Sequence, residues 1–427
     1  MATTLILVML ALLVLGFPMM IPLIVASVVA FLGFFSGLNP DIMIQQMIGG
    51  ITPSALIAVP MFIFAADIVT KGHAADRLLD LVMRFFGHVR GGLAITTAAS
   101  CTLFGAVSGS TQATVVAIGG PLRPKMLQAG YSDRFVMALT INASDVALLI
   151  PPSIGMIIYG VVSGSSIGEL FIAGIGPGLL ILVMFSAYSY VMAWRAGIPV
   201  QPRSSWGERW QAVRRAILPL GFPIIIIGGI YTGWFSPTEA AAVSVLYALL
   251  LEIVIFRSVK ISEVPDVALS TGLITAVVFI LVAAGAAFSW AISFAQIPQQ
   301  LLGGLGIADA SSTMVLITIS ITFFIGCMFV DPIVVILILV PIFAPVVDAA
   351  GIDPILVGVI VTLQAAIGSA TPPFGCDIFT AIAVFRRPYL EVIRGTPPFI
   401  IMLLGVSALL IAFPQIALFL RDLAFGY

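Results

Sequence analysis

The chain has 427 residues, of which 61% are hydrophobic and 9% charged, with a formal net charge of −1 and a mean hydropathy of +1.20. Soluble domains carry about 25% charged and about 45–50% apolar residues, so this composition excludes a soluble globular protein. The net charge is near zero, so the chain lacks the excess of basic residues that is typical of proteins that bind nucleic acid. Several apolar runs reach the ~20 residues that a helix needs to cross a bilayer, which predicts an all-α polytopic membrane protein.

Cysteine and histidine usage gives no sign of a metal or an organic cofactor. Cys101, Cys327 and Cys376 lie in apolar segments without metal-ligand spacing, which is typical of packing residues. His73 and His88 lie in a charged connecting region. The apolar run at 5–35 has no basic start, so we expect a retained helix rather than a signal peptide.

The basic residues predict the topology. They cluster at 71–90, 123–134, 195–215, 257–260 and 386–394, and Lys and Arg are absent between Lys260 and Arg386. Because loops rich in Lys and Arg stay in the cytoplasm, these clusters mark the cytoplasmic face. The resulting path places the N-terminus in the cytoplasm and the C-terminus in the periplasm.

In chain order, we expect a first crossing at 4–36, a return at 50–70, and an amphipathic helix on the cytoplasmic face at 74–89. The apolar segment 91–127 begins and ends beside cytoplasmic charge, which predicts a re-entrant hairpin or two short crossings. The remaining elements are crossings at 135–163 and 170–194, a basic cytoplasmic loop at 195–216, crossings at 217–235, 239–256 and 269–296, a second hairpin at 311–349, and crossings at 353–385 and 396–420.

Glycine and proline positions recur with an offset of 221 residues. The offset converts Gly105, Pro124, Gly130, Pro151-Pro152 and Pro177 into Gly326, Pro345, Gly351, Pro372-Pro373 and Pro398. Since these residues mark turns and helix breaks, the offset predicts two halves that bend alike, 1–194 with the hairpin 91–127 and 217–427 with the hairpin 311–349. The first hairpin is bounded by basic, cytoplasmic residues and the second by loops that are predicted to face outward. The two halves are therefore predicted to be inverted repeats, which permit alternating access. Chance recurrence is the alternative, because the chain has 40 Gly and 27 Pro.

Each half carries a polar hairpin tip and a proline-broken helix. The tips are residues 108–114 and Asp331-Pro332, and the offset pairs Ser110 with Asp331. Both residues fit an N-cap, and Asp331 fits a site residue equally well. Proline pairs free backbone carbonyls, which together with hydroxyl and amide oxygens suit a sodium ion. The alternative is a simple kink in which the hydroxyls bond back to the helix.

Acidic residues inside the apolar segments are few. Asp145, Asp331 and Asp377 would each cost on the order of 3 kcal/mol at the bilayer centre, so such residues usually serve function. Glu239 lies in a Ser-Pro-Thr-Glu sequence that predicts a structural capping box. Glu252 is expected to reach toward Arg257 or the membrane interface.

The motifs at these positions resemble a known family. The runs 108–120, 150–160 and 170–180 in the first half, and 236–242 and 371–375 in the second, are similar to the large (M) membrane subunit of tripartite ATP-independent periplasmic (TRAP) transporters, DctM type. The chain departs from the family pattern at Asp145, where a small residue is more usual, and at Asp377, where Asn is common.

The resemblance implies an inverted-repeat, elevator-type transporter with two re-entrant helical hairpins in the bacterial cytoplasmic (inner) membrane. It implies sodium-coupled import of a small organic acid, such as a C4-dicarboxylate or sialic acid. Its partners would be a small four-helix membrane subunit and a periplasmic substrate-binding protein. Two or more sodium ions would be the coupling ions.

We assign site residues on this basis. The first predicted sodium group is Ser108, Gly109, Ser110, Pro151 and Pro152, and the second is Gly326, Asp331, Ser369, Thr371 and Pro372. The predicted substrate contacts are Thr111, Asn142, Ser153, Asp331 and Asp377.

Two other functions compete with this interpretation. A stand-alone sodium/anion symporter of related fold would need no binding protein. A membrane enzyme would need a nucleophile–base pair or a metal motif such as His-Glu-x-x-His, and neither is present in the sequence. We therefore expect a transporter and not an enzyme.

Overall fold

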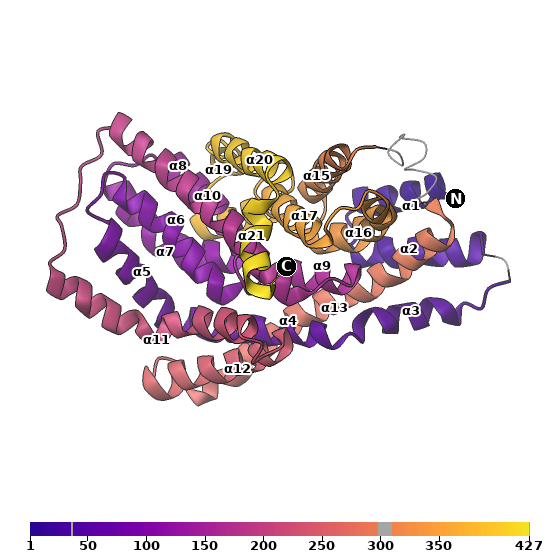
Figure 1. The fold of residues 1–427 in the computed structure, drawn as a ribbon, viewed down its shortest axis with the longest axis horizontal. Helices are drawn as coiled ribbons and strands as arrows, with labels where there is room; N and C mark the ends of the chain where they lie inside the picture. Colours follow the sequence, from indigo (N-terminus) through magenta and orange to yellow (C-terminus); the bar gives the residue numbers. More distant parts are fainter. Residues whose placement is uncertain (36, 298–309, 427) are drawn as a thin grey trace.

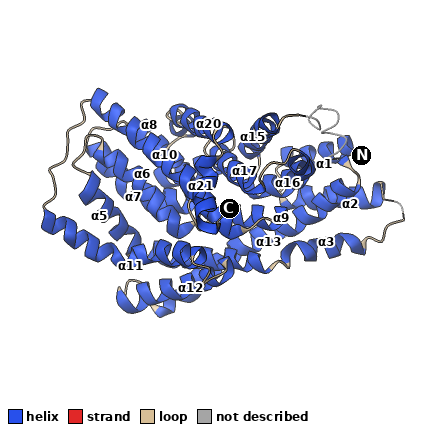
Figure 2. Cartoon of the chain, in the orientation of Figure 1, coloured by secondary structure: helices blue, strands red, loops and turns tan. Residues whose placement is uncertain are grey.

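The structure is a computed structural model that describes residues 1–35, 37–297 and 310–426. Throughout these ranges the chain folds into helices joined by loops, with no strand (Figure 2). In the described chain, seven helices are long and apolar enough to cross a membrane, or up to eight if a bent helix pair counts as one span. The predicted all-α polytopic class is confirmed.

The first half contains α1 (Ala2–Val14), α2 (Met20–Gly33), α3 (Asp41–Ile51), a 3₁₀ turn η1 (Ser54–Ile57), α4 (Ala58–Lys71), α5 (Ala74–Phe86), α6 (Gly92–Ser108), α7 (Thr111–Gln128), α8 (Asp133–Ser144), a 3₁₀ turn η2 (Asp145–Leu148), α9 (Ile154–Ser163) and α10 (Ile167–Arg195). The second half contains α11 (Trp206–Tyr231), α12 (Pro237–Leu249), a π-helical turn η3 (Leu250–Ile255), a 3₁₀ turn η4 (Ile261–Glu263), α13 (Val264–Phe294), α15 (Ser312–Phe329), α16 (Pro332–Ala349), α17 (Pro354–Ser369), α18 (Cys376–Phe385), α19 (Tyr389–Ile393), α20 (Pro397–Ala412) and α21 (Gln415–Phe425).

The N-terminal apolar run forms two helices, so the single crossing predicted at 4–36 is wrong. Helix α1 ends at Val14 and α2 begins at Met20, and between them Gly16 has a φ of +81°. Glycine adopts this φ at little steric cost, and the nearby Pro18 has no backbone N–H with which to continue a helix. The two helices pack against each other, and α3 follows before the predicted second crossing.

Two other segments differ from the sequence prediction. Only residues 196–205 link α10 to α11, because the C-terminal part of the predicted loop 195–216 is already helical. A capping box between Ser205 and Glu208 starts α11 there. The crossing predicted at 396–420 divides into α20 and α21, which are bent by 57°.

Two local predictions are confirmed. Helix α5 is amphipathic and buries one apolar face, formed by Ala74, Ala75, Leu78, Leu79 and Val82. Helix α12 starts with the predicted capping box, in which Ser236 and Glu239 each bond to the backbone N–H of the other. Glu239 therefore has a structural role.

The 221-residue offset of the sequence matches helix boundaries. Helices α7 and α16 begin and end 221 residues apart, as do the starts of α8 and α17. Gly130 and Gly351, which precede α8 and α17, both have a positive φ, and the Pro151–Pro152 and Pro372–Pro373 bonds are both cis. The two halves thus share a local course, while their opposite orientation in the membrane stays a prediction.

Each hairpin contacts the broken helices of both halves. Helix α6 packs against η2 of its own half, and its partner α7 packs against α18 of the other half. Likewise α15 packs against α17, and α16 packs against α9. In Figure 1 the α6–α7 and α15–α16 pairs lie on either side of the C-terminal helix α21, and α3, α11 and α12 follow one long edge of the view. One helix of each hairpin therefore packs against the broken helix of the other half.

Glu252, on η3, tethers the start of α5, and its carboxylate bonds there instead of reaching toward Arg257 as expected. The fully buried Glu252 carboxylate accepts hydrogen bonds from the backbone N–H groups of His73 and Ala74, both at 3.0 Å, and from the Ser258 hydroxyl. Backbone donors at a helix start have no partner within the helix, so this distant carboxylate acts as the cap of α5.

We expect Glu252→Ala to lower the thermal stability of the purified protein. The substitution leaves two backbone donors of α5 without an acceptor, which costs on the order of 1–3 kcal/mol. The measurement is the unfolding midpoint in detergent, with the exposed Asp266→Ala as control. Equal midpoints for the two variants would contradict the tether.

Candidate functional site

The first hairpin tip packs directly on the first proline break. Gly109 joins α6 to α7 with a φ of +61°, and a Cβ at this position would clash with the carbonyl oxygen of Pro152. Ser110 caps α7 by accepting from the backbone N–H of Ala113 at 3.4 Å, as predicted. Ser108 is buried close to these groups. The structure therefore brings together the tip and break segments of the first predicted sodium group.

The first break carries two of the predicted substrate residues, both buried. Ser153 caps α9 by accepting from the backbone N–H of Met156 at 3.3 Å. Asn142, near the end of α8, donates through Nδ2 to the carbonyl of Ala138 at 2.8 Å. Its side-chain oxygen meets no hydrogen-bond donor within the described chain, so it is available to a ligand.

The second hairpin tip is more open than the first. Asp331 is exposed and caps α16 by accepting from the backbone N–H of Ile333 at 2.9 Å. Gly326 lies one turn before the end of α15, where a Cβ would reach the side chain of Val335 at 3.0 Å. Gly326 thus lets α15 approach α16 closely. The cap role of Asp331 is observed, and its site role stays a prediction.

The second break packs on the end of α15. A Cβ at Gly368 would clash with Cys327, and the backbone N–H of Phe374 donates to the carbonyl of Met328 at 3.2 Å. The hydroxyls of Ser369 and Thr371 donate to carbonyls four residues earlier, at 2.9 and 2.6 Å. This back-bonding is the alternative considered from the sequence. It uses the hydroxyl hydrogens and leaves oxygen lone pairs for a cation.

A hydrogen bond joins the two halves of the site. The Thr111 hydroxyl, at the start of α7, donates to Oδ1 of Asp377 in the first turn of α18 at 2.7 Å. Beside it, Gln112 Nε2 donates to Cys376 Sγ at 3.2 Å. Two of the predicted substrate residues are therefore in direct contact, between the two predicted sodium groups.

Asp145 was left out of the predicted site, although the structure places it there. It begins η2, which packs against α7, and it is fully buried. Asp377 is bonded to Thr111 at the start of the same helix. The sequence held a signal for it, because Asp145 is an intramembrane acid three residues after Asn142 and so shares its helix face. That α7 packs against η2 and bonds to Asp377, 232 residues after Asp145, could not be read from the sequence.

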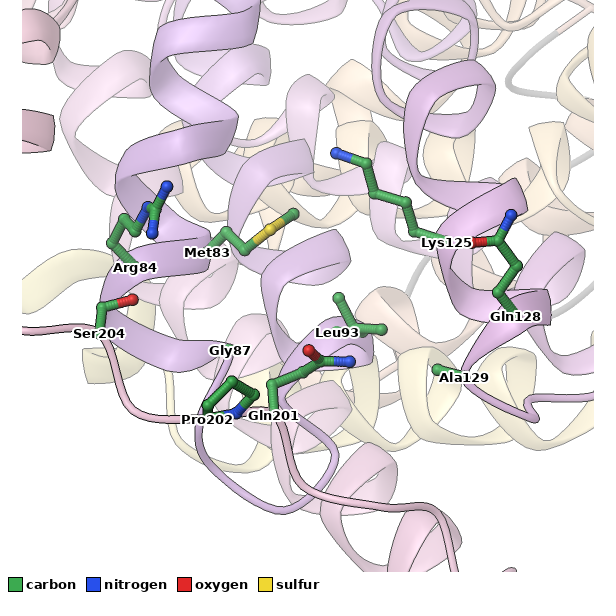
Figure 3. Close-up of a pocket in the computed structure, with 10 residues that line it drawn as sticks. All are labelled: Met83, Arg84, Gly87, Leu93, Lys125, Gln128, Ala129, Gln201, Pro202 and Ser204. Atoms are coloured by element: carbon green, nitrogen blue, oxygen red, sulfur yellow. The ribbon is translucent and has the colours of Figure 1, made fainter. Parts of the chain in front are cut away.

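Figure 3 shows a surface pocket of about 430 Å³. Its lining includes Arg84, Lys125 and Ser204, which come from α5, α7 and the link before α11. None of the predicted site residues contributes to it. The transport site at the tips and breaks stays a prediction. In the described ranges no group of three or more His, Cys, Asp or Glu side chains suited to a metal occurs.

The fold and the site define a class of protein: a polytopic membrane transport subunit whose polar centre is built from helix ends. The chain belongs to the family described as "Tripartite ATP-independent periplasmic transporter, DctM component", whose model matches residues 6–416. It is therefore the large membrane subunit of a bacterial three-part transporter and not an enzyme.

Similar proteins span the whole chain. The ectoine/5-hydroxyectoine TRAP transporter large permease protein UehC of Ruegeria pomeroyi is 70% identical over 427 residues, covering 100% of both chains. The ectoine TRAP transporter large permease protein TeaC of Halomonas elongata is 68% identical over 426 residues, again covering 100% of both. The sialic acid TRAP transporter large permease protein SiaM of Vibrio cholerae is 36% identical, covering 98% of each chain.

A solved structure shares the fold. The YdaH transporter of Alcanivorax borkumensis aligns with a TM-score of 0.65 over 96% of this chain and 97% of its own, at 16% identity. At that identity the likeness concerns the architecture alone.

We expect Gly109→Ala to lower both stability and transport. A left-handed alanine costs about 1–2 kcal/mol, and its Cβ would push the tip away from Pro152. The matched control is Gly120→Ala in α7, where a Cβ meets no atom within 4 Å. Uptake by the reconstituted transporter should fall at least about tenfold for Gly109→Ala only, because small displacements at a site are costly. Wild-type uptake by Gly109→Ala would show that the tip tolerates displacement.

Proposed function

We propose that this subunit carries ectoine or 5-hydroxyectoine into the cell. The observation that supports this most strongly is the 70% and 68% identity, over full length, to two large permeases named for these solutes. The sequence alone favoured a C4-dicarboxylate or sialic acid, but relatives named for those substrates are only 37% and 36% identical. The proposed solute is still a small organic acid, and it differs from a dicarboxylate in also carrying a positive charge.

The proposed transporter has three parts. This chain would work in the inner membrane with a small four-helix membrane subunit, and a periplasmic substrate-binding protein would deliver the solute. Membership in a tripartite family supports this arrangement over the stand-alone symporter considered above. The N-terminus would lie in the cytoplasm and the C-terminus in the periplasm, as the basic clusters predict.

A sodium gradient would drive the transport, with one ion at each tip-and-break pair. The first group offers the Gly109 and Pro152 segments and the Ser108 and Ser110 hydroxyls, and the second offers Ser369 and Thr371. Neutral oxygens of this kind suit a monovalent hard cation. In the proposed elevator mechanism, the tips and breaks move together as one unit between the two faces of the membrane.

The test of this function is uptake by proteoliposomes containing this chain and its two partners. Labelled ectoine should accumulate under an inward sodium gradient, and unlabelled succinate should not compete. Replacing sodium with potassium should remove the accumulation. Accumulation that persists in potassium alone would overturn the sodium coupling, and an absence of ectoine uptake would overturn the substrate.

Single hydroxyl deletions test the two ion groups. We expect Ser110→Ala and Thr371→Ala each to raise the sodium concentration that gives half-maximal uptake by about three- to tenfold, because each removes one oxygen near a proposed ion. Thr318→Ala is a matched control, since its exposed hydroxyl also back-bonds to a carbonyl, but within α15 and away from the tip. Sodium dependence like that of the wild type in both site variants would show that the ion groups are misplaced.

A further inference from the structure

Two buried carboxyl groups, one on η2 packed against α7 and one bonded to the start of α7, lack enough hydrogen-bond donors. Asp145 comes from η2 of the first half and Asp377 from α18 of the second, and both are fully buried. Thr111 satisfies Oδ1 of Asp377. Both oxygens of Asp145 and Oδ2 of Asp377 lack a hydrogen-bond donor in the described chain. Two carboxylates are both acceptors, so their proximity cannot satisfy either one.

The sequence segments around the acid pair supply a further acid and no basic residue. Asp331, the cap of α16 at the second tip, is a further acid of the predicted site. The segments that build the site, 91–122, 135–194 and 261–385, contain no Lys or Arg. Buried charges in proteins are normally paired, so this acid pair calls for a cation that the chain itself does not provide.

Positive helix ends lie next to the acid pair. Helix α7 starts at Thr111, whose side chain touches Asp377. Ser153 caps the start of α9, which packs against η2. The first backbone N–H groups of a helix carry partial positive charge and favour a carboxylate ligand. The centre therefore has two poles: an acid pair with unsatisfied acceptors, and helix starts with backbone donors.

We propose that Asp145 and Asp377 together bind the cationic amidinium group of the substrate and so select a zwitterion over a dianion. This inference rests on the proposed function, since ectoine is a ring that carries one amidinium and one carboxylate. An amidinium is planar, spreads its charge over two nitrogens, and presents two N–H donors. It can therefore bridge two carboxylates as a guanidinium does.

The unsatisfied oxygen of Asn142 adds an acceptor on the same helix face as Asp145. A dicarboxylate brings no donor to any of these acceptors, and it places like charges against the pair. A site built to hydrogen-bond a substrate N–H rejects analogues that lack it, because its buried polar groups are then left unpaired.

The test measures binding of labelled ectoine to the assembled membrane complex at saturating sodium. Asp145→Asn and Asp377→Asn should each weaken ectoine binding at least about tenfold, with the half-saturating sodium concentration unchanged within about twofold. The exposed Asp266→Asn should bind as wild type does. Cyclohexanecarboxylate, a ring of the same size without the amidinium, should fail to compete in the wild-type complex.

Each other outcome overturns the proposal. If ectoine binds both variants with wild-type affinity, the acid pair does not contact the substrate. If sodium affinity falls while ectoine binding at saturating sodium is retained, the pair belongs to the coupling ion. Competition by cyclohexanecarboxylate equal to that by ectoine would refute amidinium recognition without any variant having to fold. If the wild type does not take up ectoine at all, the proposed function is refuted. That result is distinguishable from a failure of the acid-pair proposal, which appears only when the wild type transports ectoine.

Discussion

The packing of hairpin ends on proline breaks is the constraint on which the rest of the site depends. At the first break the contact is Gly109 against the carbonyl of Pro152, and at the second it is Gly368 against Cys327. In both, the absence of a side chain lets one backbone approach another. Irregular backbone inside a membrane protein is stable only where it is buried in protein or lines a cavity. Each hairpin end covers the irregular segment of a broken helix in this way. The polar groups of the site lie at these contacts between hairpin ends and broken helices.

This packing also explains why the polar centre can exist without basic residues. Helix starts at the tips and breaks supply backbone donors, and the caps Ser110, Ser153 and Asp331 fix where each helix begins. The fixed positive ends of helices then take the place of Lys or Arg, which would be long, mobile and costly at this depth. Acids alone remain as charged side chains.

The sequence predicted well those features that depend on local chemistry or on the internal offset. Both hairpins, both proline breaks and the caps at Ser110, Asp331 and Glu239 lie where glycine, proline and capping residues indicated. The sequence predicted poorly what depends on contacts between distant segments. Glu252 caps a helix that starts 178 residues earlier, and nothing near it in sequence indicates that partner. Gly16 and Pro18 were a local signal for the break between α1 and α2, but apolar composition alone does not distinguish one long helix from two short ones.

The two tips differ in backbone conformation at equivalent positions. Gly109 is left-handed and fitted against a carbonyl, whereas Val330, 221 residues later, is extended with a φ of −131°. Only glycine fits the first position without strain, while an extended residue can be almost any amino acid. The two halves have a similar backbone course, but the backbone conformation restricts the choice of amino acid at the first tip more than at the second. Substitutions can accumulate at the second tip, and with them changes in what it contacts, while the first tip stays fixed.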